Sequence, residues 1–129
     1  MKTKEELEEI AKDIVDAIFT VHKNLGSGLL ESAYQACLAY ELTTRGHQVE
    51  SGKKLPVKYK DVLIEAAFHL DLRIDGVILI ENKAVQSLLP IHEAQLLTYL
   101  KLTDCRLGFL VNWNVTLIKD GIKRMVNKL

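Results

Sequence analysis

The sequence lacks a net charge and any long apolar run. Its 129 residues carry 17 Lys and Arg against 17 Asp and Glu, so the formal net charge is zero. A dedicated duplex-DNA binder usually has a net basic surface, so this class is disfavoured and any nucleic-acid contact must be a local patch. No apolar run is long enough to span a bilayer, and the N-terminal stretch M-K-T-K-E-E-L-E-E has no signal-peptide core. We therefore expect a cytoplasmic protein without membrane contact.

The sequence is also poor in cysteine. Cys37 and Cys105 lie among apolar residues and form no C-x-x-C pair, so we expect two buried, reduced thiols and not a disulfide or a metal pair. The composition, with 48% hydrophobic and 26% charged residues, is that of a soluble globular protein. A chain of 129 residues can bury one core without disulfides, so we expect a single domain over residues 1–129.

The first half of the chain predicts two helices separated by a glycine-rich loop. Thr3 and the glutamate three residues later form a capping box, and apolar residues at three-and-four spacing follow as far as Gly26. Ser27 or Gly28 is expected to cap a second helix, which runs to Arg45.

The second half predicts strands around one further helix. The expected elements are strands within residues 47–64, a hairpin over residues 68–83, a helix over residues 92–102 after Pro90, a strand over residues 105–111, a short strand over residues 115–118 and a polar tail. Pro56 cannot donate a ladder hydrogen bond, so its strand belongs at an edge or a bulge. The helix should connect two parallel strands by a right-handed crossover.

The central hairpin places charged residues within apolar strands. Its apolar rows are Leu70, Leu72 and Ile74 on the first strand, and Ile78 and Ile80 on the second. If both rows face one core, Asp71 falls opposite Glu81 and beside Lys83. This register needs a three-residue loop, residues 75–77, whereas Asp-Gly alone favours a two-residue turn that would separate the charges. Burial specifies register more strongly than turn statistics, so we favour the convergent arrangement, which a bulge could also produce.

Two charged groups of the sequence each have two interpretations. On spacing alone, the convergent charges of the central hairpin fit a solvent-facing ion cluster as well as a functional site. The second group is a strip of basic residues, Lys53, Lys54, Lys58 and Lys60. These lysines could protect an edge strand against aggregation or form a rim that follows phosphates.

Three short motifs occur in a fixed order along the chain. They are Gly28-x-x-Glu31-x-x-Tyr34, Asp71 followed after ten residues by Glu81-x-Lys83, and Gln95-x-x-x-Tyr99. Together they resemble the GxxExxY protein family, a bacterial and archaeal branch of the PD-(D/E)XK nuclease superfamily. The resemblance covers residues 14–124, and it departs from the pattern where His69-Leu70 precedes the aspartate in place of a proline.

The resemblance implies an α/β fold with a restriction-endonuclease-like (PD-(D/E)XK) core. Its mixed sheet would consist of an antiparallel three-stranded meander, a crossover helix and a fourth, parallel strand, with helices on both faces. The implied activity is hydrolysis of nucleic-acid phosphodiesters with Mg²⁺ or Mn²⁺. Binding to nucleic acid should be weak and salt-dependent, and a homodimer is left open.

The resemblance also implies a role for individual residues. The implied catalytic residues are Asp71, Glu81, Lys83 and Glu31. The implied metal ligands are the carboxylates of Asp71, Glu81 and Glu31 with the backbone carbonyl of Asn82. The residues that would orient the substrate are Gln95, Tyr99, Lys53, Lys54 and Arg73.

A non-catalytic module is the rival interpretation. A nuclease fold can persist as a platform that binds nucleic acid or a protein, because fold does not dictate function. The intact Asp71 and Glu81-x-Lys83 set favours the enzyme, since clustered charges destabilise a fold that gains nothing from them.

Overall fold

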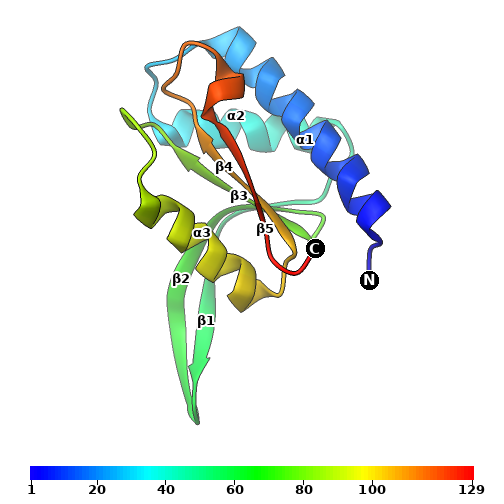
Figure 1. The fold of residues 1–129 in the computed structure, drawn as a ribbon, viewed down its shortest axis with the longest axis vertical. Coiled ribbons are helices and arrows are strands. Elements are labelled where there is room, and N and C mark those ends of the chain that lie inside the picture. Colours follow the sequence, from blue (N-terminus) through cyan, green and yellow to red (C-terminus); the bar gives the residue numbers. More distant parts are fainter.

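The computed structural model describes residues 1–129 as one five-stranded sheet with helices on both faces (Figure 1). The elements are α1 (Lys4–Leu25), α2 (Glu31–Thr44), β1 (Val49–Tyr59), β2 (Val62–Ile74), β3 (Ile78–Lys83), α3 (Pro90–Thr103), β4 (Leu107–Asn112), the 3-10 turn η1 (Ile118–Gly121) and β5 (Ile122–Val126). The strands lie in the order β1-β2-β3-β4-β5, and only the β3–β4 pair is parallel. The predicted α/β architecture, with its meander and crossover helix, is confirmed. No helix is long and apolar enough to cross a membrane.

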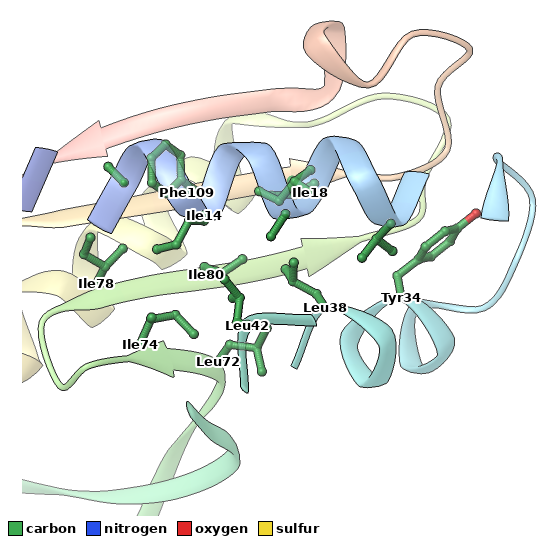
Figure 2. Packing of buried hydrophobic residues seen from close by; sticks show 14 of the residues in the cluster. Ile14, Ile18, Tyr34, Leu38, Leu42, Leu72, Ile74, Ile78, Ile80 and Phe109 are labelled. Carbon is green, nitrogen blue, oxygen red and sulfur yellow. The ribbon is translucent and has the colours of Figure 1, made fainter. Parts of the chain in front are cut away.

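Two apolar clusters hold the helices on the sheet. The larger lies between the α1 and α2 layer and one face of the sheet, where Ile14, Leu38 and Ile80 meet (Figure 2). The smaller lies under α3 on the other face and includes Leu79 and Leu96. Each face of β3 is therefore buried, which explains why five of its six residues are buried.

The helix boundaries confirm one predicted cap and correct another. Thr3 and Glu6 form the expected capping box of α1. The N-cap of α2 is Leu30, not Ser27 or Gly28 as predicted, and it has no side-chain cap. The Tyr34 hydroxyl donates to the carbonyl oxygen of Gly26 at 2.6 Å and accepts from the backbone N–H of the residue before Leu30 at 3.2 Å. These hydrogen bonds keep the loop residues before Leu30 out of the helix, so α2 begins only at Glu31.

The C-terminal strand was predicted on the wrong side of its turn. Residues 115–118 form no strand, and residues 122–126 are β5, not a polar tail. The side chain of Asn112 binds both backbone groups of Val85, at 3.1 and 3.0 Å, and this fastens the start of the intervening loop away from the sheet edge. The chain pairs with β4 only after η1, where Ile122 lies opposite Val111.

Gly121 is expected to tolerate no side chain. A Cβ there would lie 2.1 Å from the backbone oxygen of Asn112 and 3.0 Å from Val115 Cγ2. Gly121→Ala should therefore lower the free energy of unfolding by roughly 1–3 kcal/mol, the usual cost of overpacking. Urea unfolding would measure this, with the exposed neighbour Asp120→Ala as control. Equal stability of the two variants would contradict the close approach.

An ion cluster joins the two helices of one layer to the β2–β3 turn. The ring of His47 lies between two carboxylates, with Nδ1 2.6 Å from Asp75 Oδ2 and Nε2 2.5 Å from Asp13 Oδ2. Arg45 at the end of α2 also binds Asp13, at 2.8 Å. Burial alone would lower the pKa of His47, but Asp75 and Asp13 outweigh it, so the pKa is raised above its ordinary value.

This cluster should make stability depend on pH. Because the folded protein holds the His47 proton more tightly than the unfolded chain, the contribution is complete below the ordinary histidine pKa. It should disappear as pH rises through the raised pKa. His47→Gln should cost roughly 1–3 kcal/mol at pH 5.5 and less at pH 9. Urea titrations across this range would test it, with His92→Gln as control; a pH-independent difference would contradict it.

Candidate active site

The β2–β3 hairpin has the predicted register. Ile74 pairs with Ile78 and Leu72 with Ile80, across the expected three-residue loop. The loop is closed by a hydrogen bond of 3.0 Å from the backbone N–H of Val77 to the carbonyl of Ile74. Asp75 and Gly76 both have positive φ, 53° and 71°, as in the two-residue turn that Asp-Gly favours, and Val77 is the one additional residue that gives the register of the hydrophobic pattern.

The backbone ladder between β2 and β3 ends beyond the Leu72–Ile80 pair, and two carboxylates continue it. Glu81 Oε2 accepts from the backbone N–H of Asp71 at 2.9 Å, and Asp71 Oδ2 accepts from the backbone N–H of Asn82 at 2.8 Å. Each acidic side chain thus satisfies a backbone donor on the opposite strand. This exchange fixes both carboxyl groups at the point where the strands separate.

The faces of β2 exchange at the same point, which corrects one expectation. Leu70 and Leu72 were predicted to lie in one apolar row. Leu72 belongs to the larger cluster under α1 and α2, whereas Leu70 packs with Leu79 in the cluster under α3. The change of face therefore coincides with the end of the β2–β3 pairing, where the two carboxyl groups lie.

Burial and repulsion by neighbouring carboxylates raise the pKa of both Asp71 and Glu81. Glu81 is only 3% exposed. Burial, and then the neighbouring Asp71 carboxylate, raise the pKa of Glu81 to about 8. Burial likewise raises the pKa of Asp71, although the backbone N–H of Asn82 and the Lys83 ammonium oppose the rise. A pair of this kind is stabilised by any cation that approaches it.

The donor set fits a small divalent cation. Glu81 Oε1 accepts no hydrogen bond from the protein, and Asp71 Oδ1 has only His69 Nδ1 nearby, at 3.8 Å. The side-chain nitrogen of Asn82 is the one buried side-chain polar atom that lacks a hydrogen-bond partner, so these two unpaired oxygens are accessible to solvent. The backbone N–H of Asn82 points toward β2, where it donates to Asp71. In a strand the N–H and the carbonyl of one residue point the same way, so the Asn82 carbonyl also points toward the carboxyl pair. Mg²⁺ is commonly bound by one or two carboxylates together with water and substrate phosphates.

Glu31 does not complete a ready-made cluster of three acids. Its Oε2 accepts from the backbone N–H of Ala84 at 3.2 Å, directly after β3. No three acidic, histidine or cysteine side chains are arranged to hold a metal ion. Glu31 is nevertheless close enough for its charge to raise the pKa of both Asp71 and Glu81, after the larger effect of burial. It therefore lies beside the pair rather than within it.

Gln35 is a neighbour of the site that the sequence analysis missed. Its Nε2 donates to the backbone carbonyl of Asp71 at 3.1 Å and to Ser51 Oγ at 3.1 Å. The spacing from Glu31 to Gln35 is one helical turn, so both side chains emerge on one face of α2. That spacing is the signal that could have identified it.

Lys83 and the Gln95-x-x-x-Tyr99 pair meet as the motif order suggested. Lys83 Nζ donates to Gln95 Oε1 at 3.2 Å, which joins the end of β3 to α3. The Tyr99 ring packs against Phe68 with centroids 5.1 Å apart. Burial and the Glu81 carboxylate raise the pKa of Tyr99, so its hydroxyl keeps its proton at neutral pH.

Trp113 holds the end of β3 from the opposite face. Its backbone N–H donates to the carbonyl of Lys83 at 2.9 Å, and its Nε1 donates to Asn82 Oδ1 at 2.8 Å. The ring stacks on Tyr34 with centroids 4.8 Å apart and planes 6° apart. The side chain of Asn82 is thus committed to the core. Tyr34, the last residue of the G-x-x-E-x-x-Y motif, contacts the residue that positions Asn82 and Lys83.

The basic residues predicted to orient substrate are divided between two places. Arg73 Nε donates to Glu50 Oε1 at 2.6 Å, and Lys53 also pairs with Glu50. Lys54 pairs in register with His69, two residues from Asp71, and forms no ion pair. The other two lysines of the strip, Lys58 and Lys60, lie at the far end of the hairpin. β1 is an edge strand and its register shifts around Pro56, as expected.

The carboxylate pair does not lie in one of the four larger cavities of the molecule. All four are lined in part by α1, and one of them also includes the N-terminus and residues 104–106.

Comparison with known proteins agrees with this arrangement. No curated protein and no solved structure gives a significant match to the chain. The family model of the PD-(D/E)XK nuclease superfamily matches residues 8–125, which include every element that contributes to the carboxylate pair and its surroundings. The chain belongs to the PD-(D/E)XK nuclease superfamily.

Proposed function

We propose that this protein is a nuclease of the GxxExxY branch that hydrolyses phosphodiester bonds in nucleic acid with Mg²⁺ or Mn²⁺. Nucleases of the superfamily generally use divalent metal ions. The observation that carries the proposal is the reciprocal hydrogen bonding of Asp71 and Glu81. It holds the buried Glu81 and the half-buried Asp71 carboxyl groups together although their proximity costs stability.

In this proposal the metal is held by Asp71, Glu81 and the backbone carbonyl of Asn82. Glu31 assists from α2, where it already binds the backbone beyond Lys83. A divalent metal in such a site acidifies a bound water and stabilises charge on the phosphate. The oxygens available for it are the two that reach solvent, Asp71 Oδ1 and Glu81 Oε1.

The remaining residues orient the reacting groups. Lys83 is fixed by Gln95, so its ammonium lies beside the carboxyl pair without being neutralised by either one directly. We assign to it the placement of the attacking water and the stabilisation of developing negative charge. Tyr99, still protonated, can donate a hydrogen bond to the phosphate backbone. Lys53 and Arg73 both pair with Glu50, so a substrate phosphate would compete with that carboxylate for them. Lys54 forms no ion pair and can contact substrate directly.

Metal binding is the test that separates the enzyme from a non-catalytic platform. Mn²⁺ should bind in calorimetric titrations and raise the melting temperature by linkage. Cleavage of a labelled oligonucleotide should require the metal and stop in chelator. A protein that binds the oligonucleotide but is indifferent to millimolar Mn²⁺ would be the non-catalytic module instead.

A further inference from the structure

His22 is a buried polar residue on the core face of α1 that the proposed mechanism does not use. It follows Ile14 and Ile18 of the larger apolar cluster (Figure 2) at the four-residue spacing of one helix face. An apolar side chain at this position would need no hydrogen-bond partner, whereas a buried imidazole does. The partner is the carbonyl oxygen of Trp113, 3.2 Å from His22 Nε2. A carbonyl oxygen only accepts, so Nε2 carries the proton and donates.

Trp113 is the residue where α1, α2 and the end of the sheet meet. It follows β4 directly, and its backbone N–H extends the β3–β4 ladder by one bond of 2.9 Å to the carbonyl of Lys83. Its ring stacks on Tyr34 from α2 and on His22 from α1, with centroids 4.8 and 6.3 Å away. Its Nε1 donates to Asn82 Oδ1 at 2.8 Å. The end of β3 therefore depends on Trp113, and the Trp113 carbonyl depends on His22.

The side chain of Asn82 shows that this arrangement is not the most stable one available. It is 1% exposed, and its Nδ2 is buried without a hydrogen-bond partner. An unpaired buried donor costs about 1–3 kcal/mol, so the residue needs an explanation other than stability. The backbone of Asn82 supplies one, because its N–H binds Asp71 Oδ2 at 2.8 Å. The bond from Trp113 thus holds a residue that takes part in the carboxylate site.

We propose that His22 is a positioning residue for the carboxylate site and that it acts through Trp113. Its hydrogen bond fixes the backbone of Trp113, and Trp113 fixes the side chain of Asn82 and the carbonyl of Lys83. The direction of the Asn82 carbonyl toward the carboxyl pair, and the point from which the Lys83 side chain leaves the sheet, both follow from these contacts. The inference rests on the proposed function, because the site that His22 positions is the proposed metal site.

Two substitutions separate the hydrogen bond of His22 from its ring. His22→Gln keeps an N–H donor on a side chain of similar length and loses the ring, whereas His22→Phe keeps a ring and loses the donor. Substitution of a residue that orients a metal ligand typically lowers metal affinity by roughly 10–100-fold. His22 acts through one more residue, so His22→Phe should bind Mn²⁺ about tenfold more weakly in calorimetric titrations. His22→Gln should bind Mn²⁺ as the wild type does.

Leu7→Val is the control for a general loss of stability. Leu7 belongs to the same apolar cluster, and it lies roughly 22 Å from His22 along α1. This variant should melt at a lower temperature than the wild type and keep its Mn²⁺ affinity. A residue that only filled the core at position 22 would behave in the same way, so the change in Mn²⁺ affinity distinguishes positioning from packing.

Trp113 itself gives a readout that needs no metal and no cleavage. It is the one tryptophan of the sequence, so its indole N–H gives a single resonance in nuclear magnetic resonance spectra. In chelator, the indole and backbone N–H groups of Trp113 should exchange with solvent roughly three- to tenfold faster in His22→Phe than in the wild type, because one hydrogen bond no longer opposes local opening. His22→Gln and Leu7→Val should leave both exchange rates near those of the wild type.

The results distinguish a failure of this inference from a failure of the proposed function. Equal Mn²⁺ affinity of the wild type and His22→Phe would overturn the positioning role alone. Equal losses in His22→Gln and His22→Phe would also overturn it, since the donor would then be irrelevant. A wild type that binds no Mn²⁺ would overturn the proposed function and this inference together. If His22→Phe does not fold, His22→Leu removes the donor with a smaller side chain; unfolding of both would make His22 a structural residue and overturn the inference.

Discussion

Glu81→Gln should abolish cleavage and, above about pH 8, make the protein more stable than the wild type. The amide oxygen can still accept from the backbone N–H of Asp71, so the hairpin keeps its geometry. The variant loses one of the two carboxylates of the site. We expect cleavage to fall by roughly 10³-fold or more, equivalent to about 4 kcal/mol of transition-state stabilisation.

The stability gain follows from the raised pKa. Burial and the Asp71 carboxylate raise the pKa of Glu81 to about 8 from the ordinary 4.5. The folded protein therefore binds this proton more tightly than the unfolded chain, so wild-type stability declines as pH rises from the ordinary pKa to the raised one. Glutamine carries no charge to bury. Its advantage should grow over this interval and reach on the order of 3 kcal/mol.

Two measurements check this result together. Urea unfolding in chelator at pH 5 and pH 9 gives the stability difference, and oligonucleotide cleavage gives the activity. Mn²⁺ should raise the melting temperature of the wild type but not that of Glu81→Gln or Asp71→Asn. Glu93→Gln on α3 is a control, because that carboxylate pairs with Lys123 away from the site. Wild-type cleavage by Glu81→Gln would remove Glu81 from the proposed mechanism.

The placement of the carboxylate pair was predictable because it depends on a local rule. Period-two alternation and one buried face determine which residues of a hairpin are opposite one another. The pairing of Leu72 with Ile80 follows from the apolar residues alone, and it places Asp71 opposite Glu81. The exchange of hydrogen bonds between side chain and backbone was not predictable, because it depends on the ladder ending at Leu72. The position of Leu70 in the other apolar cluster was not predictable from alternation either.

Features set by distant contacts were not accessible from the sequence. The first turn of α2 lacks the predicted cap because the Tyr34 hydroxyl holds the preceding loop. β5 begins after Gly121 because only a glycine can approach the Asn112 carbonyl so closely. Residues 115–118 have the same alternating pattern as a strand, so periodicity could not distinguish the two segments.

The G-x-x-E-x-x-Y motif shows how one pattern can serve two purposes. Tyr34 stacks on Trp113, which binds both Asn82 and the Lys83 carbonyl. Glu31 binds the backbone directly after Lys83. The motif therefore supports the end of β3 from the α2 side. Its glutamate is expected to assist the other carboxylates in holding a metal ion, and in the structure it also binds the backbone at the end of β3.

Lys83→Met should separate catalysis from folding. Methionine retains most of the apolar stem, which packs along the sheet, and removes only the ammonium group. That ammonium donates a single, partly buried hydrogen bond to Gln95 Oε1. In chelator the ammonium also lowers the pKa of Glu81, but burial and the Asp71 carboxylate dominate. The variant should therefore fold, with its largest loss of stability in chelator and recovery when Mg²⁺ is added.

Cleavage by Lys83→Met should fall by roughly 10²–10³-fold, the usual loss when one electrostatic contact to a transition state is removed. Melting curves with and without Mg²⁺, together with cleavage of a labelled oligonucleotide, give both quantities. Lys101→Met is the matched control, since Lys101 is an exposed lysine on α3. Gln95→Leu should show a smaller loss of cleavage, because it releases the ammonium without removing it. Unfolding of Lys83→Met in both conditions would make the lysine structural. Cleavage at the wild-type rate by a folded Lys83→Met would exclude the ammonium from the mechanism, even with the metal site intact.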